Sequence, residues 1–338
     1  MRLDEAGEFT AITRLSRVCA SPGRAVRVGI GDDAAAFRPT PGALTLVTAD
    51  SLVEGVHFDL AWTSWSDLGY KSLAASLSDI AAMGGVPRFY LVSLALPGDV
   101  KVEDVEDLYR GMEALGTRHG VRLIGGDTCA SPGPAVISVT VLGEVGPMGV
   151  VRRKGARPGD HIYVTGTLGD SSAGLSLLRT AQARRGATGA NGQDGAVAFL
   201  KGRHLRPTPR LKAGRLLSGI ATSMIDISDG FSSDLGHILE QSRVGAEVRG
   251  GALPLSKEMA AVFGGDEAAL FALHGGEDYE LLFTARPAAK DTLKALARRA
   301  GTRFTLVGAI TDGAGAELVA GDGLSYRLGS GGYEHFRK

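Results

Sequence analysis

Acidic residues recur beside glycine or serine where short apolar runs of the sequence end. The residues of this kind are Asp32, Asp33, Asp50, Asp127, Asp226, Asp229, Glu277 and Asp278. The first pair, in the stretch VGIGDDAAAF, follows a run that we predict to be a buried strand. At least five of these carboxylates are expected just past strand ends, where ligand sites of strand-helix folds often gather. A pocket shared by so many negative charges is strongly destabilised unless it holds cations.

Magnesium is the cation that this donor set favours, because the oxygens are hard and thiolates and histidines are scarce around them. Mg²⁺ commonly bridges carboxylates to substrate phosphates, and the neighbouring glycines let backbone amides approach phosphate oxygens. The stretch VTGTLGDSSAG has the same character, since it turns into a predicted helix whose N-terminus favours anions. The alternative for a single aspartate is a turn residue or a helix cap, which is the simpler interpretation of Asp170 and Asp234.

Several other chemistries lack their sequence signatures. The chain has no G-x-x-x-x-G-K-[ST] loop, no G-x-G-x-x-G after a first strand, no protein-kinase H-R-D and D-F-G set and no G-x-S-x-G elbow. Among basic residues, 152–154 form either a solvated linker or a phosphate clamp. His57 comes seven residues after Asp50 and is either a structural histidine or part of the site.

Composition limits the classes of protein to consider. The 338 residues suffice for two domains, and the 37 basic and 37 acidic residues leave no net charge to attract nucleic acid or anionic lipid. Cys19 and Cys129 form no C-x-x-C pair, so a disulfide framework or a zinc cluster is not expected. The N-terminus has no signal-peptide core, and no run approaches the roughly 20 apolar residues of a membrane span. We therefore expect a cytoplasmic protein with neither nucleic-acid nor membrane partners.

The pattern of apolar residues predicts alternating strands and helices in both halves of the chain, hence a mixed α/β (α+β) fold. Strands are predicted at 24–30, 43–50, 88–97, 121–128, 135–145, 161–166, 223–228, 245–250, 279–285 and 303–310. Helices are predicted at 64–85, 102–120, 166–185, 231–242, 266–273 and 287–300.

Local signals refine this organisation. Ser66 is the expected N-cap of the helix at 64–85, which carries Asp79 and is buried almost all round. The glycine-rich stretch 184–196 is expected to be a flexible surface insertion. The turn at 155–160 marks a boundary near residue 150, between domains 1–150 and 151–338.

Taken together, the motifs resemble one family. VGIGDDAA, TADSLVEGVHF, YKSLAASLSDIAAMGGVP, IGGDT, GARPGDHIYVTGTLGDSSAGL, HLRPTPR, MIDISDGFSSDLGHI, GGEDYELLFT and GYEHF occur in this order, as in thiamine-monophosphate kinases of the aminoimidazole-ribonucleotide-synthetase-like superfamily. The resemblance spans nearly the whole chain. It implies phosphorylation of thiamine monophosphate by ATP, with several Mg²⁺ ions and ATP near the interface of a homodimer. It also implies that the N-terminal sheets pair into a barrel across the dimer, and that the C-terminal domain completes the substrate site.

The resemblance also assigns roles to matching positions. Those for Mg²⁺ are Asp33, Thr48, Ala49, Asp50, Asp79, Asp127, Asp226 and Asp229, with Ala49 standing where the family usually has threonine or serine. Those for ATP are Gly126, Asp127, Arg153, Ser228 and, on the adenine side, Tyr109. Those for the substrate are His57, Glu277 and Tyr333.

A direct in-line transfer of the γ-phosphoryl group fits this set of residues, because the acceptor phosphate is already anionic and needs no strong general base. We expect no covalent nucleophile. The alternatives are another ATP-dependent synthetase of the superfamily and a non-catalytic protein that binds nucleotide and Mg²⁺.

Overall fold

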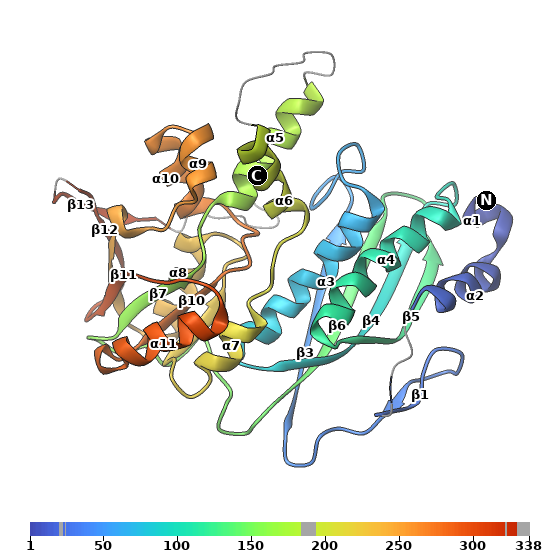
Figure 1. Cartoon of the computed structure of the whole chain (residues 1–338), viewed down its shortest axis with the longest axis horizontal. Coiled ribbons are helices and arrows are strands. Elements are labelled where there is room, and N and C mark those ends of the chain that lie inside the picture. Colours follow the sequence, from blue (N-terminus) through green and yellow to red (C-terminus); the bar gives the residue numbers. More distant parts are fainter. Residues whose placement is uncertain (20–22, 24, 184–193, 322, 330–338) are drawn as a thin grey trace. The chain divides into compact units, whose positions relative to one another are not determined.

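The chain forms two units in the computed structural model, which describes residues 1–19, 23, 25–183, 194–321 and 323–329. The first unit comprises Met1–Ile80 and Gly85–Pro147, and the second comprises Ala81–Gly84 and Met148–Lys338. Each unit has its own large sheet and its own helices (Figure 1). The mixed α/β architecture expected from the sequence is therefore confirmed.

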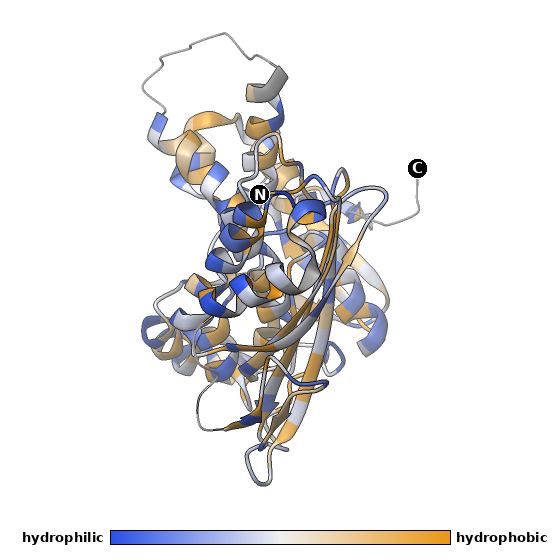
Figure 2. Ribbon diagram, turned by 90° about the vertical axis from the view of Figure 1, so that its right-hand side faces the viewer, coloured by the Kyte–Doolittle hydropathy of each residue, from blue (hydrophilic) through white to orange (hydrophobic). Residues whose placement is uncertain are grey.

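Four strands form the main sheet of the first unit. Their order is β3 (Leu44–Val53), β6 (Val136–Val145), β4 (Val86–Leu96) and β5 (Arg122–Ala130). Strands β4 and β5 pair in parallel, and the other pairs are antiparallel. In β6, Ile137, Val139 and Val141 have no exposed surface and alternate with partly exposed residues, which is the period of a sheet with one buried face. Hydrophobic residues run along these strands in Figure 2.

Helices α3 (Trp65–Ala82) and α4 (Val102–His119) pack on the buried face of this sheet (Figure 1). Helix α4 ends at Gly120, whose left-handed backbone has a φ of 72°. The N-cap of α3 is Ser64, and the prediction of Ser66 was wrong. The Ser64 hydroxyl accepts a hydrogen bond from the Asp67 amide at 3.1 Å. Asp67 is the third residue of the helix, and an N-cap side chain typically accepts from the amide at this position.

Two glycines let α3 and α4 approach closely. A Cβ atom on Gly69 would lie 1.9 Å from the Leu108 carbonyl oxygen, and one on Gly111 would lie 1.9 Å from the Ser66 carbonyl oxygen. Any larger residue at these positions would therefore push the helices apart.

The remaining elements of the first unit are short. They are α1 (Leu3–Ala6), α2 (Glu8–Val18) and a small sheet of β1 (Val26–Val28) and β2 (Ala36–Phe37). We predicted a buried strand before the Asp32–Asp33 pair, but β1 belongs to this partly exposed two-stranded sheet and both aspartates are exposed. The apolar run is too short to cross a core, because it pairs only with the two residues of β2.

The face of the main sheet opposite α3 and α4 carries exposed residues, both apolar and polar. Val47 on β3 is 65% exposed, and Val86 at the start of β4 is 36% exposed. A row of paired residues, Ser51, Ser138, Ser93 and Asp127, crosses all four strands on this face. We call it the open face.

Seven strands form the sheet of the second unit. Their order is β13 (Ser325–Leu328), β12 (Gly315–Val319), β9 (Gly245–Arg249), β11 (Phe304–Thr311), β7 (His161–Thr165), β10 (Leu281–Ala285) and β8 (Ser223–Asp226). The pairing is antiparallel except between β12 and β9. Ile162, Ile225, Phe231 and Leu235 are completely or almost completely buried in its core.

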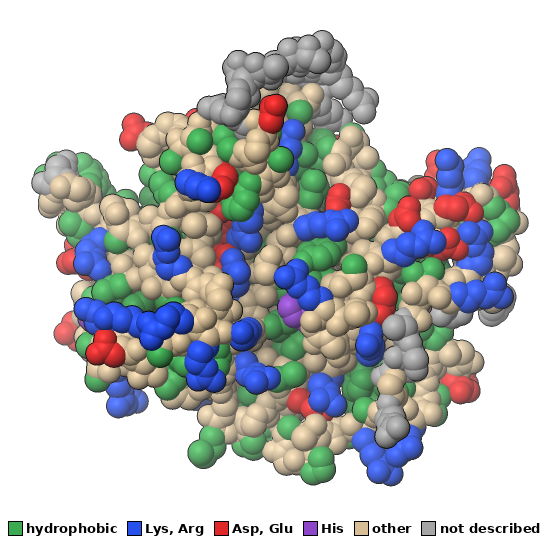
Figure 3. Space-filling model, viewed as in Figure 1, with side chains coloured by type: hydrophobic (Ala, Val, Ile, Leu, Met, Phe, Trp, Pro, Cys, Tyr) green, Lys and Arg blue, Asp and Glu red, His purple; other side chains and the backbone are tan. Residues whose placement is uncertain are grey.

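The helices of the second unit are α5 (Asp170–Ala183), α6 (Asp194–Leu205), α7 (Leu211–Leu217), α8 (Phe231–Ser242), α9 (Lys257–Val262), α10 (Gly265–His274) and α11 (Lys290–Ala300). Short 3₁₀ turns lie at Gly250–Ala252 and Pro287–Ala289. Helix α8 has the predicted bounds. Basic side chains gather over α11 on the face shown in Figure 3.

Some elements of the second unit were not predicted, namely α6, α7, α9, β12 and β13. The glycine-rich insertion is shorter than predicted, because residues 194–196 already belong to α6. Its other residues, 184–193, lie outside the described part of the chain. Among the described residues, no helix has the length and apolarity that a membrane crossing requires.

Candidate functional site

Asp50, Thr48 and Asp79 form an acidic cluster in the first unit. Thr48 and Asp50 lie on β3, and Asp79 lies on the last turns of α3, where its carboxylate accepts a hydrogen bond from the Thr48 hydroxyl. Burial, together with the negative charge of Asp79, raises the pKa of Asp50 from 3.8 to about 6, although a hydrogen bond from Ser76 opposes the shift. The Asp50 Oδ2 atom is buried and has no hydrogen-bond partner among the described residues.

This cluster fits a magnesium ion. It brings together two carboxylates and a hydroxyl, which are the hard oxygen donors that Mg²⁺ prefers. A buried carboxylate oxygen without a donor is unfavourable, and so is a second carboxylate beside it. A cation at this place would pair with the buried Asp50 oxygen and screen the repulsion between Asp50 and Asp79.

The sequence placed Asp50 and Asp127 just past strand ends, which is wrong for both. Strand β3 continues to Val53 and β5 continues to Ala130, because the residues after each aspartate still pair with β6 and β4. Asp127 stands in the row on the open face. Asp50 stands in the row that includes Gly126 and the buried Val139 and Val92.

Other predicted ligands of the first unit are more exposed. Asp33 is exposed near the β1–β2 sheet, and Ala49 is exposed on the open face. His57 is half-buried in the loop after β3, where its Nδ1 atom accepts the Val53 amide at 3.0 Å. Its neutral form therefore carries the proton on Nε2.

In the second unit, Asp226, Ser228 and Asp229 lie at the C-terminal end of β8 and in the turn before α8. One oxygen of Asp234 accepts the amides of all three turn residues, 228–230, at 3.1–3.2 Å. Burial and the charge of Asp229 raise the pKa of Asp234 to about 7. The interpretation of Asp234 as a residue that caps the turn is confirmed. Asp229, Asp234 and His237 each offer a donor atom within 4.8 Å of the others.

Glu277 is brought to this turn by the antiparallel pairing of β10 with β8. The Glu277 amide donates to the Ser228 carbonyl at 2.8 Å, and Leu281 pairs with Asp226. Glu277 and Asp278 lie between α10 and β10, as the predicted helix at 266–273 and strand at 279–285 implied. An antiparallel neighbour starts where β8 ends, so these residues reach the same edge of the sheet. The structure therefore places Asp226, Ser228, Asp229 and Glu277 together.

The sequence prediction missed a buried ionic cluster behind this edge. Glu280 has no exposed surface, and its carboxylate accepts hydrogen bonds from Arg203 at 2.9 Å and from Arg210 Nε at 2.6 Å. A signal was available, since Glu280 falls inside an apolar strand pattern and a buried carboxylate requires a partner. The partners are Arg203, at the end of α6, and Arg210, the last residue of HLRPTPR.

Asp278 and Asp170 are also buried in this region. Asp278 accepts the amides of Gly169 at 2.5 Å and Ser171 at 3.1 Å, at the N-terminus of α5. Burial raises the pKa of Asp278 to about 7, against the opposing effect of Arg203 and these amides. Asp170 is more than a cap, because it accepts hydrogen bonds from the hydroxyls of Thr167 and Ser256.

The remaining predicted residues lie elsewhere. Arg153 and its neighbours at 152 and 154 are exposed. Tyr109 is only 6% exposed in the core of the first unit, a position that gives its assignment to the adenine side no support. Burial raises the pKa of its hydroxyl. Tyr333 lies outside the described residues.

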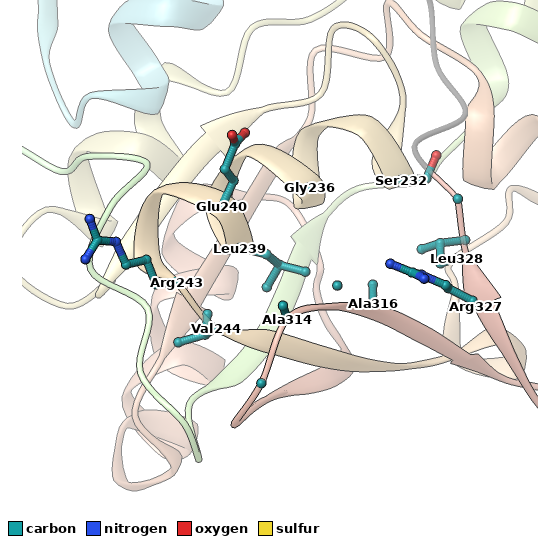
Figure 4. Close-up of a pocket in the computed structure, with 13 residues that line it drawn as sticks. Ser232, Gly236, Leu239, Glu240, Arg243, Val244, Ala314, Ala316, Arg327 and Leu328 are labelled. Carbon is teal, nitrogen blue, oxygen red and sulfur yellow. The ribbon is translucent and has the colours of Figure 1, made fainter.

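A separate pocket of about 690 Å³ lies between α8 and the β12–β13 hairpin, and none of the predicted residues lines it. Figure 4 shows Arg327 extending toward the middle of this pocket, whereas Glu240 points away from it.

The two-unit fold, with acidic turns in both units, is that of the AIR synthase related proteins. The model of their N-terminal domain matches residues 31–145, and the model of their C-terminal domain matches residues 157–321. Within this class, the chain is similar over nearly its whole length to thiamine-monophosphate kinases, and it belongs to their family. The resemblance stated from the motifs is thereby confirmed.

Three relatives support this assignment. The thiamine-monophosphate kinase of Escherichia coli strain K12 is 40% identical over 331 residues, which cover 98% of each chain. The crystal structure of thiamine-monophosphate kinase from Stenotrophomonas maltophilia K279a is 39% identical with a TM-score of 0.83, covering 94% of this chain and 97% of that one. A structure described as AaThiL complexed with AMPPCP and TMP is 34% identical with a TM-score of 0.75, covering 99% of each chain.

Proposed function

We propose that this chain transfers the γ-phosphoryl group of ATP to the phosphate of thiamine monophosphate, giving ADP and thiamine diphosphate. The observation that carries the proposal is the Asp50–Asp79 pair with its unpartnered buried oxygen, in a chain of this family. The complex of a relative with AMPPCP and TMP, which we take to be an ATP analogue and thiamine monophosphate, supports the same pair of substrates.

The first unit supplies Asp33, Thr48, Asp50, Asp79 and Asp127 for Mg²⁺, with the backbone of Ala49 beside them. The second unit supplies Asp226 and Asp229. Mg²⁺ at these positions neutralises phosphate charge and aligns the two anionic substrates.

ATP is held by Gly126 and Asp127 of the first unit and by Arg153 and Ser228 of the second. The exposure of Arg153 leaves its guanidinium available to pair with a phosphate. Glu277, His57 and Tyr333 bind thiamine monophosphate. Glu277 is suited to the positive charge or the amino group of thiamine, because its carboxylate is 27% exposed at the edge of the sheet.

The transfer is in-line and needs no covalent intermediate. The acceptor phosphate is ionised near neutral pH, so the main barrier is the repulsion between two anions. The acidic, metal-binding character of the site and the lack of a serine or cysteine nucleophile motif agree with this mechanism.

We also propose a homodimer in which the open faces of two first units meet and close a barrel. Val47 and Val86 leave apolar surface on this face, and antiparallel sheets normally bury their apolar face. Domain 1–150 then provides dimerisation and the binding of ATP and Mg²⁺, and domain 151–338 completes the substrate site.

Phosphorus-31 NMR of the purified protein with MgATP and thiamine monophosphate tests the activity. We expect ADP and thiamine diphosphate to appear together, and EDTA to stop both. Consumption of ATP without thiamine diphosphate would favour another synthetase of the superfamily. Binding of nucleotide with no turnover would favour a non-catalytic role.

A further inference from the structure

Arg203 and Arg210 both form ion pairs with Glu280, and we call these three residues the Arg–Glu–Arg cluster. Besides its bonds to Arg203 and to Arg210 Nε, the buried Glu280 carboxylate accepts a hydrogen bond from Arg210 Nη2 and one at 2.6 Å from the Thr165 hydroxyl. Arg210 therefore uses two donors on one carboxylate, the geometry that lysine cannot reproduce. Both arginines are committed to Glu280, so they are poor candidates for a phosphate clamp.

The cluster lies directly behind a strained turn. Glu277 has a φ of 65° and Tyr279 a φ of 52°, a left-handed conformation that non-glycine residues adopt at a cost in free energy. Such a conformation persists only where surrounding contacts over-determine it. Arg203 contributes one of these contacts, because it also donates to the backbone carbonyl of Asp278 at 3.3 Å.

Backbone hydrogen bonds hold the other side of the turn. The Glu277 amide donates to Ser228, the Tyr279 amide donates to Ile227 at 2.9 Å, and the Ile227 amide donates to Glu280 at 2.8 Å. The turn is thus fastened between β8 and the Arg–Glu–Arg cluster.

His204, the residue after Arg203 on α6, connects the cluster to the Glu277 side chain. Its Nδ1 atom lies 3.5 Å from a Glu277 carboxylate oxygen and 3.1 Å from the Ser171 hydroxyl. His204 is only 3% exposed, so its position follows that of α6. A shift of Arg203 therefore moves a neighbour of the Glu277 carboxylate.

We propose that the Arg–Glu–Arg cluster is a positioning device that holds the strained 277–279 turn and so aims Glu277 at the positively charged ring of the acceptor. In this role Arg203, Arg210 and Glu280 act through the turn and not through contact with a substrate. This inference rests on the proposed function, in which Glu277 binds thiamine monophosphate.

Loss of the cluster should weaken binding of the acceptor and leave binding of the nucleotide unchanged. The turn with Ser228 and Asp229 has its own anchor, since Asp234 accepts three of its amides. Loosening the 277–279 turn therefore disorders Glu277 while the 228–230 turn stays in place. If only a tenth of the molecules keep the competent turn, the apparent affinity for the acceptor falls about tenfold.

Arg210→Lys is the variant that tests this, because it keeps the positive charge beside Glu280 and removes the two-donor contact. We expect the KM for thiamine monophosphate to rise about tenfold, while kcat and the KM for ATP stay within about twofold. The amides of Glu277 and Tyr279 should exchange hydrogen at least about tenfold faster, because the open fraction of the turn rises from a minority to about nine-tenths. Arg249→Gln is the matched control, since this exposed arginine of the same unit makes only a 3.4 Å contact with a carbonyl.

A parallel loss in kcat and both KM values would overturn the proposal, and so would faster exchange with an unchanged KM for the acceptor. Should Arg210→Lys fail to fold, Thr165→Val removes a neutral donor from the same carboxylate, and Thr165→Ser, which retains the hydroxyl, is its control. A wild-type protein without kinase activity would refute the proposed function alone, because the exchange rates still report on the turn.

Discussion

Replacing Asp50 with asparagine should stabilise the first unit in the absence of Mg²⁺ and abolish its stabilisation by Mg²⁺. The Asp50 carboxylate is partly buried beside Asp79, and its Oδ2 atom has no partner among the described residues. In Asp50→Asn the amide is neutral, and it removes the repulsion while keeping an oxygen for Ser76. The proposed cation site is therefore a site of stored electrostatic strain.

The magnitude follows from the pKa of Asp50, which is raised from 3.8 to about 6. The folded state holds the proton more tightly than the unfolded state, so ionised Asp50 lowers the free energy of unfolding. The penalty is absent below about pH 4 and fully present above about pH 6, where it is on the order of 2–3 kcal/mol. Asp50→Asn should recover about this amount near pH 8 and little near pH 4.

Tryptophan fluorescence during urea unfolding measures this effect in the right unit, because both tryptophans of the chain, Trp62 and Trp65, belong to the first unit. In EDTA near pH 8, the variant should unfold at a higher urea concentration than the wild type. Excess Mg²⁺ should stabilise the wild type, by about 2.7 kcal/mol at a hundred times its Kd, and leave the variant unchanged. Asp107→Asn, on the exposed side of α4, is the control and should change neither value appreciably.

An Asp50→Asn protein that is less stable than the wild type in EDTA would refute this reasoning. The same holds if the variant retains the full gain from Mg²⁺, since the cation would then bind elsewhere.

Three further predictions concern other parts of the molecule. Asp127→Asn should lower turnover by about a hundredfold or more without changing the urea midpoint, and near-normal turnover would exclude Asp127 as a metal ligand. Val47→Arg should convert a homodimer to monomers, because it places an unpaired charge in an apolar interface, and light scattering that still reports a dimer would contradict the role of the open face. The pKa of Asp278 is raised to about 7, so its contribution to stability falls as the pH rises from about 4 to 7. Relative to the wild type, Asp278→Asn should gain up to about 4 kcal/mol over this range in urea unfolding followed by circular dichroism, and a constant difference would show that Asp278 is ionised throughout.

Local patterns in the sequence were sufficient for most of the regular elements. The bounds of α8 were predicted from its hydrophobic period, and Gly120 was predicted as the end of α4 because a left-handed residue suits glycine. The short helices α7 and α9 were not predicted, because six or seven residues carry too little hydrophobic periodicity to be distinguished from a loop.

The sequence by itself determined which residue types carry the chemistry. Runs of glycine and aspartate in both halves indicated hard oxygen ligands and phosphate, and their order along the chain identified the family. These conclusions need no tertiary structure, because they depend on the identity and the local spacing of residues.

Only the tertiary structure decided how the acidic residues divide into functional and structural groups. Asp50 meets Asp79 across a strand and a helix, while Glu280 meets arginines 70 and 77 residues away in the chain. Carboxylates in similar apolar stretches thus form a pair with like charge in one place and a neutralised ion-pair cluster in another. Strand register and burial determine which of the two arises, because they set the charges and the water that each carboxylate encounters.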